Sequence, residues 1–334
     1  MRFCERDGTR LVAVEPDAPA APHSPASEAC ACGGTEFDED GFCTRCGKAR
    51  PPASRAFDHV EQAPLPTLGG VCDRGRRHPW NEDALSLGTE VVGDPESASE
   101  TVHVMVVCDG VSSARDSQRM AQVAAEVTRA RLLEAARSQL DPNLAMRQAI
   151  AAAHAAVCAV AAEDEALLKE DDPAKPQAPG CTIVAALVHG GRATVGWVGD
   201  SRAYRFAADA ADLLTHDHSW FNEVVDSGSM SPEEAAQAPE RNAITRCLGP
   251  LGVDGPDQVP EADVVACDVS PGQMLLCCSD GLWKYTADPA ELGALVRDLA
   301  AKSPLPLDIS RQLIEFANAR GGSDNITAAI LTLT

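Results

Sequence analysis

The order of the apolar segments after residue 66 restricts the fold of this 334-residue chain most strongly. Short β-branched runs of strand length come in groups, and longer segments with helical periodicity come in pairs. A parallel sheet needs a crossover, usually a helix, between successive strands, so grouped strands favour antiparallel sheets. The order therefore predicts an α+β fold in which helices and sheets form separate layers.

The hydrophobic periods place the individual elements. Apolar residues at helical spacing predict helices at 116–137, 143–162, 289–300 and 306–319. Apolar runs bounded by turn residues predict strands at 101–108, 181–188, 192–198, 202–206, 263–268, 273–278 and 325–333. Gly-Gly and Gly-Asp-Ser turns join three of these strands into a meander.

Composition changes near residue 66 and divides the chain. Residues 15–29 and 49–66 are rich in Pro, Ala and Ser and cannot bury enough apolar surface to offset the entropy of ordering. We therefore predict a short N-terminal segment at 1–50, a linker at 51–66 and a domain of catalytic size at 67–334.

Charge and hydropathy exclude several classes of partner. The chain has 28 Lys and Arg against 50 Asp and Glu, a formal net charge of −22, and would repel nucleic acids and anionic lipids. No segment is expected to span a bilayer, and the N-terminus lacks an apolar secretory signal. We expect a cytoplasmic protein without nucleic-acid or membrane partners. Several of its 13 cysteines lie in apolar runs, where a reduced thiol acts as a small hydrophobe, so disulfides are not required.

One sequence pattern occurs four times: an aspartate followed by a small residue lies next to an apolar strand. The pairs are Asp109-Gly110, Asp200-Ser201, Asp280-Gly281 and Asp324-Asn325. Any one pair alone is more often a plain turn. Four of them, with the acids of Asn81-Glu82-Asp83, favour carboxylates that converge, and converging carboxylates need a cation among them. All-oxygen ligands select a hard ion, Mg²⁺ or Mn²⁺.

Paired divalent ions suit the hydrolysis of phosphoesters. They lower the pKa of a bound water, orient a phosphate and stabilise the leaving oxygen. The chain has no Gly-x-Ser-x-Gly, no P-loop and no Gly-x-Gly-x-x-Gly, so a protein nucleophile or a nucleotide-binding loop is not indicated.

Eight motifs in a fixed order over residues 68–334 resemble the metal-dependent serine/threonine protein phosphatases of type 2C, in their bacterial form. They are Asp73-Arg-Gly with Asn81-Glu82-Asp83, Val107-Cys108-Asp109-Gly110, Gly180-Cys-Thr182, Gly199-Asp200-Ser-Arg202, Leu214-Thr-His-Asp-His218-Ser, Ile244-Thr-Arg-Cys-Leu-Gly249, Cys278-Ser-Asp280-Gly281-Leu and Ser323-Asp324-Asn325-Ile-Thr327.

The resemblance implies a four-layer α-β-β-α sandwich and two Mn²⁺ or Mg²⁺ ions. It implies hydrolysis of phosphoserine and phosphothreonine by a metal-bridged hydroxide, with phosphorylated proteins as partners and a bacterial Ser/Thr kinase, or its substrates, as counterpart. The segment 220–246 would form the flap that influences substrate choice. The implied roles are Asp109 bridging both ions, Gly110 binding the second ion through its carbonyl, Asp280 and Asp324 holding the first ion, Asp83 and Glu82 holding waters around the second, and Asp200 and Asn325 in support.

The chain departs from the family pattern at three places. His78 stands where an arginine usually contacts the substrate phosphate, so His78 or Arg77 would take that role. Val111 to Ala114 replace a Gly-Gly-His-like stretch, and no aspartate directly precedes Gly180 to hold a third ion. Two alternatives remain open: a catalytically weak pseudophosphatase that acts as a binding or scaffold protein, and a phosphatase that acts on an anti-sigma-factor antagonist.

The N-terminal segment contains two close cysteine pairs, each followed by glycine: Cys30 and Cys32, then Cys43 and Cys46. This pattern resembles a zinc ribbon, in which four thiolates complete a tetrahedral site and stabilise a segment too short for its own core. The alternative is a metal-free tail. A second candidate cluster, His216-Asp217-His218, is better explained by packing, because one short cluster rarely builds a site alone.

Overall fold

The computed structural model describes residues 2–3, 10–11, 44–46, 57–93, 100–111, 117–163, 179–250 and 259–334. The chain divides into two units, Met1–Ser54 and Arg55–Thr334. In the first unit, strand β1 (Arg2–Phe3) pairs antiparallel with β2 (Arg10–Leu11), and residues 44–46 form an exposed turn. Cys46 lies in that turn, whereas Cys30, Cys32 and Cys43 lie outside the described residues, so the predicted zinc ribbon stays a prediction.

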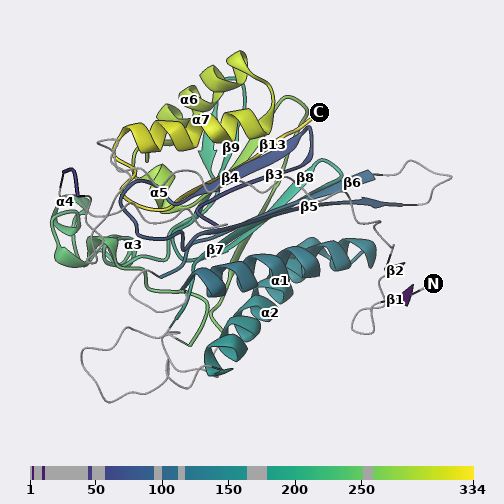
Figure 1. Cartoon of the computed structure of the whole chain (residues 1–334), viewed down its shortest axis with the longest axis horizontal. Helices are drawn as coiled ribbons and strands as arrows, with labels where there is room; N and C mark the ends of the chain where they lie inside the picture. Colours follow the sequence, from purple (N-terminus) through teal and green to yellow (C-terminus); the bar gives the residue numbers. More distant parts are fainter. Residues whose placement is uncertain are drawn as a thin grey trace. The chain divides into compact units, whose positions relative to one another are not determined.

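The second unit is built on two antiparallel sheets (Figure 1). The six-stranded sheet has the order β10 (Ala211–Leu213), β9 (Arg202–Phe206), β12 (Met274–Cys278), β13 (Ile326–Thr332), β4 (Leu68–Asp73) and β3 (His59–Leu65). The five-stranded sheet has the order β11 (Asp263–Asp268), β8 (Arg192–Val198), β7 (Ile183–His189), β6 (Glu100–Cys108) and β5 (Ala84–Val92).

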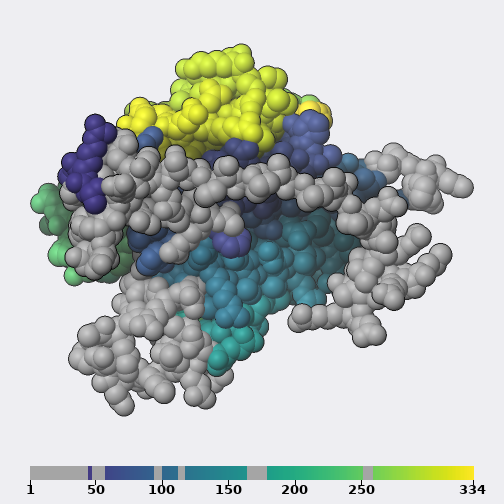
Figure 2. Space-filling model, viewed as in Figure 1, coloured from purple at the N-terminus to yellow at the C-terminus, as the bar shows by residue number. Residues whose placement is uncertain are grey.

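Two pairs of helices cover the outer faces of the sheets. Helices α1 (Ser117–Arg137) and α2 (Pro142–Glu163) pack on the five-stranded sheet, and α6 (Pro289–Lys302) and α7 (Pro306–Ala319) pack on the six-stranded sheet (Figures 1 and 2). A third core, with Leu85, Met105 and Leu275, fills the space between the sheets. The predicted α+β sandwich and its helices are thereby confirmed.

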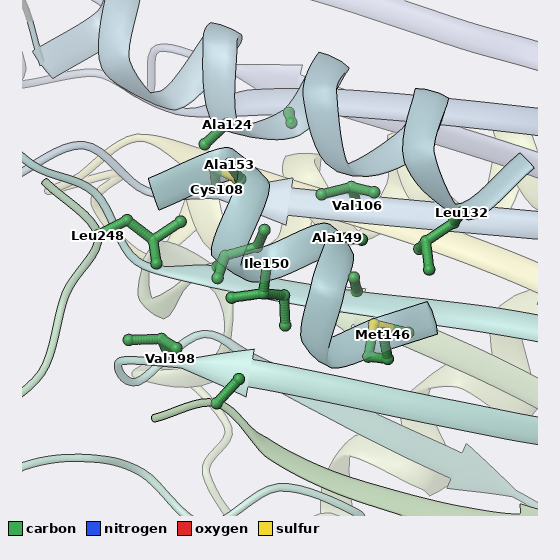
Figure 3. Close-up of a cluster of buried hydrophobic side chains, with 14 of the residues drawn as sticks. Val106, Cys108, Ala124, Leu132, Met146, Ala149, Ile150, Ala153, Val198 and Leu248 are labelled. Atoms are coloured by element: carbon green, nitrogen blue, oxygen red, sulfur yellow. The ribbon is translucent and has the colours of Figure 1, made fainter. Parts of the chain in front are cut away.

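Helix α2 shows how one layer is held. Its residues Met146, Ala149, Ile150 and Ala153 face strands of the sheet beneath, where they meet Val106 and other buried side chains (Figure 3). By length and composition α2 would pass for a membrane span, so the expectation that no segment of the chain qualifies is wrong for this helix. Alanine supplies the apolarity, and the packing in Figure 3 accounts for it.

The structure differs from the prediction where a linker was expected at 51–66. Residues His59–Leu65 form β3, which pairs with β4 at the edge of the six-stranded sheet. Pro64 lies at a register shift between Gln62 and Leu65, a position where an edge strand tolerates proline. A polar, proline-containing segment can therefore form an irregular edge strand as well as a linker, and composition alone does not distinguish the two.

The segment predicted as a flap forms short helices between β10 and β11. They are α3 (Trp220–Asp226), α4 (Pro232–Ala235) and a 3₁₀ turn at Pro239–Asn242. The Ser219 hydroxyl caps α3, and a capping box between Ser231 and Glu234 starts α4. One further short helix, α5 (Asp280–Trp283), directly follows β12.

Candidate functional site

The predicted acidic residues gather at one end of the sandwich because the strands carrying them start or stop there. In the five-stranded sheet Ala84 pairs with Cys108, so Asp83 and Asp109 adjoin the same end of β5 and β6. In the six-stranded sheet Cys278 pairs with Ala328, which brings the end of β12 beside the start of β13. Antiparallel register therefore collects Asp280 and Asp324 at that sheet's end, and hydrogen bonds join the two ends.

Asp83 makes two of the hydrogen bonds that cross between the sheets. Its Oδ2 accepts hydrogen bonds of 2.7 Å from both the Ser279 and the Thr327 hydroxyls. Its Oδ1 is buried and has no hydrogen-bond partner. Burial and the charges of Asp280 and Asp324 together raise the pKa of Asp83 to about 8, although the hydrogen bonds from the two hydroxyls oppose the shift. An ionised Asp83 with one orphaned oxygen is a ready ligand for a cation.

The charged forms of the neighbouring carboxyl groups are disfavoured for the same reasons. Burial and the charges of the other acids raise the pKa of Asp109 and of Asp280, and they raise that of Asp200 to about 7. Asp280 Oδ1 is also buried without a hydrogen-bond partner. The orphaned oxygens and the all-carboxylate donor set fit Mg²⁺ or Mn²⁺. As the side chains stand, no three His, Cys, Asp or Glu groups in the described ranges meet around one point.

The backbone around Asp109 is held from two sides. The Asp109 carbonyl accepts a 2.8 Å hydrogen bond from the Thr182 N–H, and Gly110 forms a bridge with Cys181. A Cβ atom on Gly110 would lie 2.7 Å from the Glu82 carbonyl oxygen and 2.8 Å from the Ser117 Cβ. Only glycine fits this close approach, so the Asp-Gly pair is fixed by packing as well as by turn geometry.

Asn325 ties the start of β13 to the loop before β5. Its Oδ1 accepts a 2.7 Å bond from the Glu82 N–H, and its Nδ2 donates to the carbonyls of Arg74 at 2.9 Å and Trp80 at 3.0 Å. The side chain is buried and uses both ends of its amide. This geometry suits the supporting role expected for Asn325, and Asp200 is likewise buried beside Asp280.

The two predicted phosphate contacts lie on the loop between β4 and β5. His78 is placed between two acids, with Nδ1 3.6 Å from Glu82 Oε2 and Nε2 3.5 Å from Asp324 Oδ1. Arg77 is exposed, and its backbone N–H donates to the Gly322 carbonyl at 3.2 Å. His78 thus lies beside two acids of the cluster, whereas the Arg77 side chain is exposed.

The cluster His216-Asp217-His218 has partners elsewhere, as the packing interpretation expects. Asp217 pairs with Arg202 at 2.7 Å, and His216 pairs with Asp226 at 2.7 Å. His218 Nδ1 accepts a bond from the Gly199 N–H at 3.1 Å, and its Nε2 lies 3.1 Å from Asp263. These side chains anchor the base of the segment 220–246.

Sequence reasoning missed several residues of the site. Ser279 and Thr327 bond Asp83, and Lys284 pairs with Asp280 one helical turn further along the chain. The spacing of four between Asp280 and Lys284 is a signal that could have been used, because i and i+4 share a helix face. No local pattern connects Ser279 or Thr327 to Asp83, because they are 196 and 244 positions away.

A cavity of about 260 Å³ opens beside the acidic cluster, under the segment 220–246. Its lining includes Asp200, Asn222, Arg241, Trp283 and Lys284. Residues of the segment 220–246 and two groups of the acidic site, Asp200 and Lys284, therefore line the same cavity.

The raised pKa values predict how the stability of the metal-free protein depends on pH. Asp83 and Asp200 bind their protons more tightly when folded, near pH 8 and pH 7, than at the unfolded value of 3.8. The unfolded chain therefore releases these protons first, and the free energy of unfolding falls as pH rises from about 4 to about 8. We expect a loss on the order of 6 kcal/mol, measured by urea unfolding in EDTA between pH 5 and pH 8.

Two controls accompany that measurement. Asp83→Asn should reduce the pH dependence, since Asp200 still titrates. Saturating Mn²⁺ should flatten it, because a bound cation holds the carboxylates ionised. Stability that rises over this pH range in EDTA would contradict the electrostatic description.

A family model described as "Protein phosphatase 2C" matches residues 81–317. Among curated proteins, protein phosphatase PhpP of Streptococcus pneumoniae is 33% identical over 155 residues, which cover 46% of this chain and 58% of that protein. The matched region thus spans somewhat more than half the length of this relative.

Solved structures extend the likeness over most of the chain. The PPM Ser-Thr phosphatase MsPP from Mycobacterium smegmatis, solved with cacodylate, matches with a TM-score of 0.58 and 29% identity, and covers 81% of this chain and 100% of that one. The catalytic domain of the serine/threonine phosphatase PstP, solved with two manganese ions, has the same fold, with a TM-score of 0.57 and 23% identity over 81% of this chain and 97% of that one.

Proposed function

The chain belongs to the protein phosphatase 2C family, and from this premise we propose that it is a metal-dependent phosphatase for phosphoserine and phosphothreonine in proteins. The observation that carries the proposal is the gathering of acidic side chains from both sheets at one end of the sandwich, with two buried carboxylate oxygens that lack partners. Such an arrangement is costly unless cations bind it, so it is retained for a purpose other than stability.

The roles we propose follow the placement of the residues. Asp109, Asp280, Asp324 and Asp83, with the Gly110 carbonyl, would hold two Mn²⁺ or Mg²⁺ ions, and Glu82 would orient waters beside them. When bound, these ions supply an activated water and positive charge for the phosphate oxygens. His78 and Arg77 lie on the adjoining loop and would orient the substrate phosphate. Asn325 and Asp200 keep the surrounding backbone and charges in place.

The alternative of a pseudophosphatase scaffold is not favoured. A binding protein without turnover has no need to keep four aspartates whose charges raise one another's pKa. His78 and the stretch from Val111 to Ala114 are departures in sequence, but they leave the carboxylates intact. We propose phosphorylated cytoplasmic proteins as substrates, a Ser/Thr kinase or its targets among them.

The test is phosphate release from a phosphothreonine peptide in Mn²⁺, in Mg²⁺ and in EDTA. We expect turnover with either ion and none in EDTA, and Asp280→Ala should abolish it. Folded protein that releases no phosphate with any ion would overturn the proposal and would favour the scaffold alternative.

For the N-terminal segment we propose the zinc ribbon formed by Cys30, Cys32, Cys43 and Cys46, supported by their spacing and by the glycines that follow each pair. Elemental analysis of the purified full chain should give about one zinc per molecule, and Cys43→Ser should remove it. A full chain without zinc would leave the segment as a metal-free tail.

A further inference from the structure

Lys284 is the cation placed most directly on the acidic site. Its Nζ contacts Asp280 Oδ2, and it also lines the cavity that Asp200 lines. The charges of Asp280, Asp200 and Asp324 all favour its charged form and raise its pKa, against the effect of burial. Lys302 is the other lysine in the described part of the chain, and it lies in the last turn of α6.

The position of Lys284 is fixed by the short helix α5. The Lys284 N–H donates to the Asp280 carbonyl, which closes one turn and places both side chains on the same face. Trp283 within this turn donates its Nε1–H to the Asp200 carbonyl at 2.9 Å. The guanidinium of Arg202 lies 3.7 Å from the centre of the Trp283 ring. These contacts fix the turn that places Lys284 beside Asp280, in the cavity that Asp200 also lines.

The contact with Lys284 gives the two carboxylate oxygens of Asp280 different surroundings. Lys284 occupies Oδ2, while Oδ1 remains buried and without a hydrogen-bond partner. Asp280 therefore offers a single oxygen to any further cation. An ammonium group at this place also repels a divalent ion approaching from the same side.

We propose that Lys284 is a tethered counter-cation that takes the place of a divalent ion on the Asp200–Asp280 side of the site. It stabilises the acidic cluster when no metal is bound, and it limits how many divalent ions the cluster holds and how tightly the last of them binds. The inference rests on the proposed function only in that the cluster binds divalent ions. Lys284 is a positioning residue, since it acts on the ions through Asp280.

The experiment titrates the metal-free full chain with Mn²⁺ by calorimetry and by the EPR signal of free Mn²⁺. Lys284→Met keeps the length of the side chain and removes its charge. We expect it to bind one more ion per chain than the wild type, or to bind the weakest ion about tenfold more tightly. Lys284→Arg, which keeps the charge, should match the wild type. So should Lys302→Met, which removes an exposed lysine charge from the last turn of α6.

A second readout does not depend on metal binding. In EDTA, Lys284→Met should lower the melting temperature more than Lys302→Met does, because the acids lose their counter-cation, and Mn²⁺ should then raise it by more than in the wild type. Equal Mn²⁺ affinity, equal stoichiometry and equal melting temperatures in EDTA for the two Met variants would overturn the proposal. A wild type that binds no Mn²⁺ would instead contradict the proposed metal-dependent function, and the EDTA comparison would still test the counter-cation.

Discussion

Asp109→Asn is expected to lower kcat/KM for a phosphothreonine peptide by roughly 10³-fold or more, while the metal-free protein becomes more stable. Asp109 follows β6, and its backbone is held by Thr182. Asparagine has nearly the same shape, so the fold should be kept. The substitution removes one carboxylate from the ligand set and, at the same time, removes a charge that Asp83, Asp280, Asp200 and Asp324 repel.

The two effects of Asp109→Asn are measured separately. Steady-state kinetics in Mn²⁺ gives the loss of activity, and thermal unfolding in EDTA should show a melting temperature higher by about 2–4 °C per kcal/mol of relieved repulsion. Asp268→Asn is the matched control, because the Asp268 side chain on β11 is 90% exposed and remote from the acids. Activity within tenfold of the wild type, or a lower melting temperature in EDTA, would contradict the role given to Asp109.

Arg202→Leu is expected to destabilise the protein by about 3–4 kcal/mol, since it leaves Asp217 buried without its partner. The guanidinium donates to both oxygens of Asp217, at 2.7 to 3.2 Å, and the side chains are only 14% and 8% exposed. The substitution also removes the contact with the Trp283 ring and so loosens α5. Urea unfolding monitored by circular dichroism gives the change in free energy.

The control for Arg202→Leu is Arg131→Leu. Arg131 pairs with Glu134 at 3.1 Å, but those side chains are 59% and 61% exposed, and such a pair contributes at most about 0.5 kcal/mol. A second variant that combines Arg202→Leu with Asp217→Leu should recover part of the lost stability, because no lone charge remains buried. A loss below 1 kcal/mol for Arg202→Leu alone would show that the buried pair is not needed for stability.

Periodicity and turn residues predicted the elements that are buried and regular. The helices at Ser117–Arg137 and Pro306–Ala319 and the strand at Glu100–Cys108 lie within a residue or two of the predicted ranges. The aspartates at strand ends were predictable because antiparallel strands of similar length start and stop together.

The parts of the fold and of the site that were not predicted depend on contacts between distant segments, which produce no pattern in the local sequence. The strands Leu68–Asp73 and Ala84–Val92 were not predicted; each contains glycine, which has low strand propensity. A Cβ on Gly69 would lie within 3 Å of Leu307, so this glycine is required by the close approach of α7. The partners of Asp83 and the anchoring of Lys284 likewise arise only when distant segments pack.

The hydrogen bonds that cross between the sheets also determine when the site can form during synthesis of the chain. Asn325 and Glu82 are 243 positions apart, and Thr327 and Asp83 are 244 apart. During synthesis, Glu82 and Asp83 leave the ribosome long before Asn325 and Thr327, the residues that bond to them. Contacts so distant in sequence form late and slowly. The proposed phosphatase activity would then begin only after Thr327 has left the ribosome and bonded to Asp83.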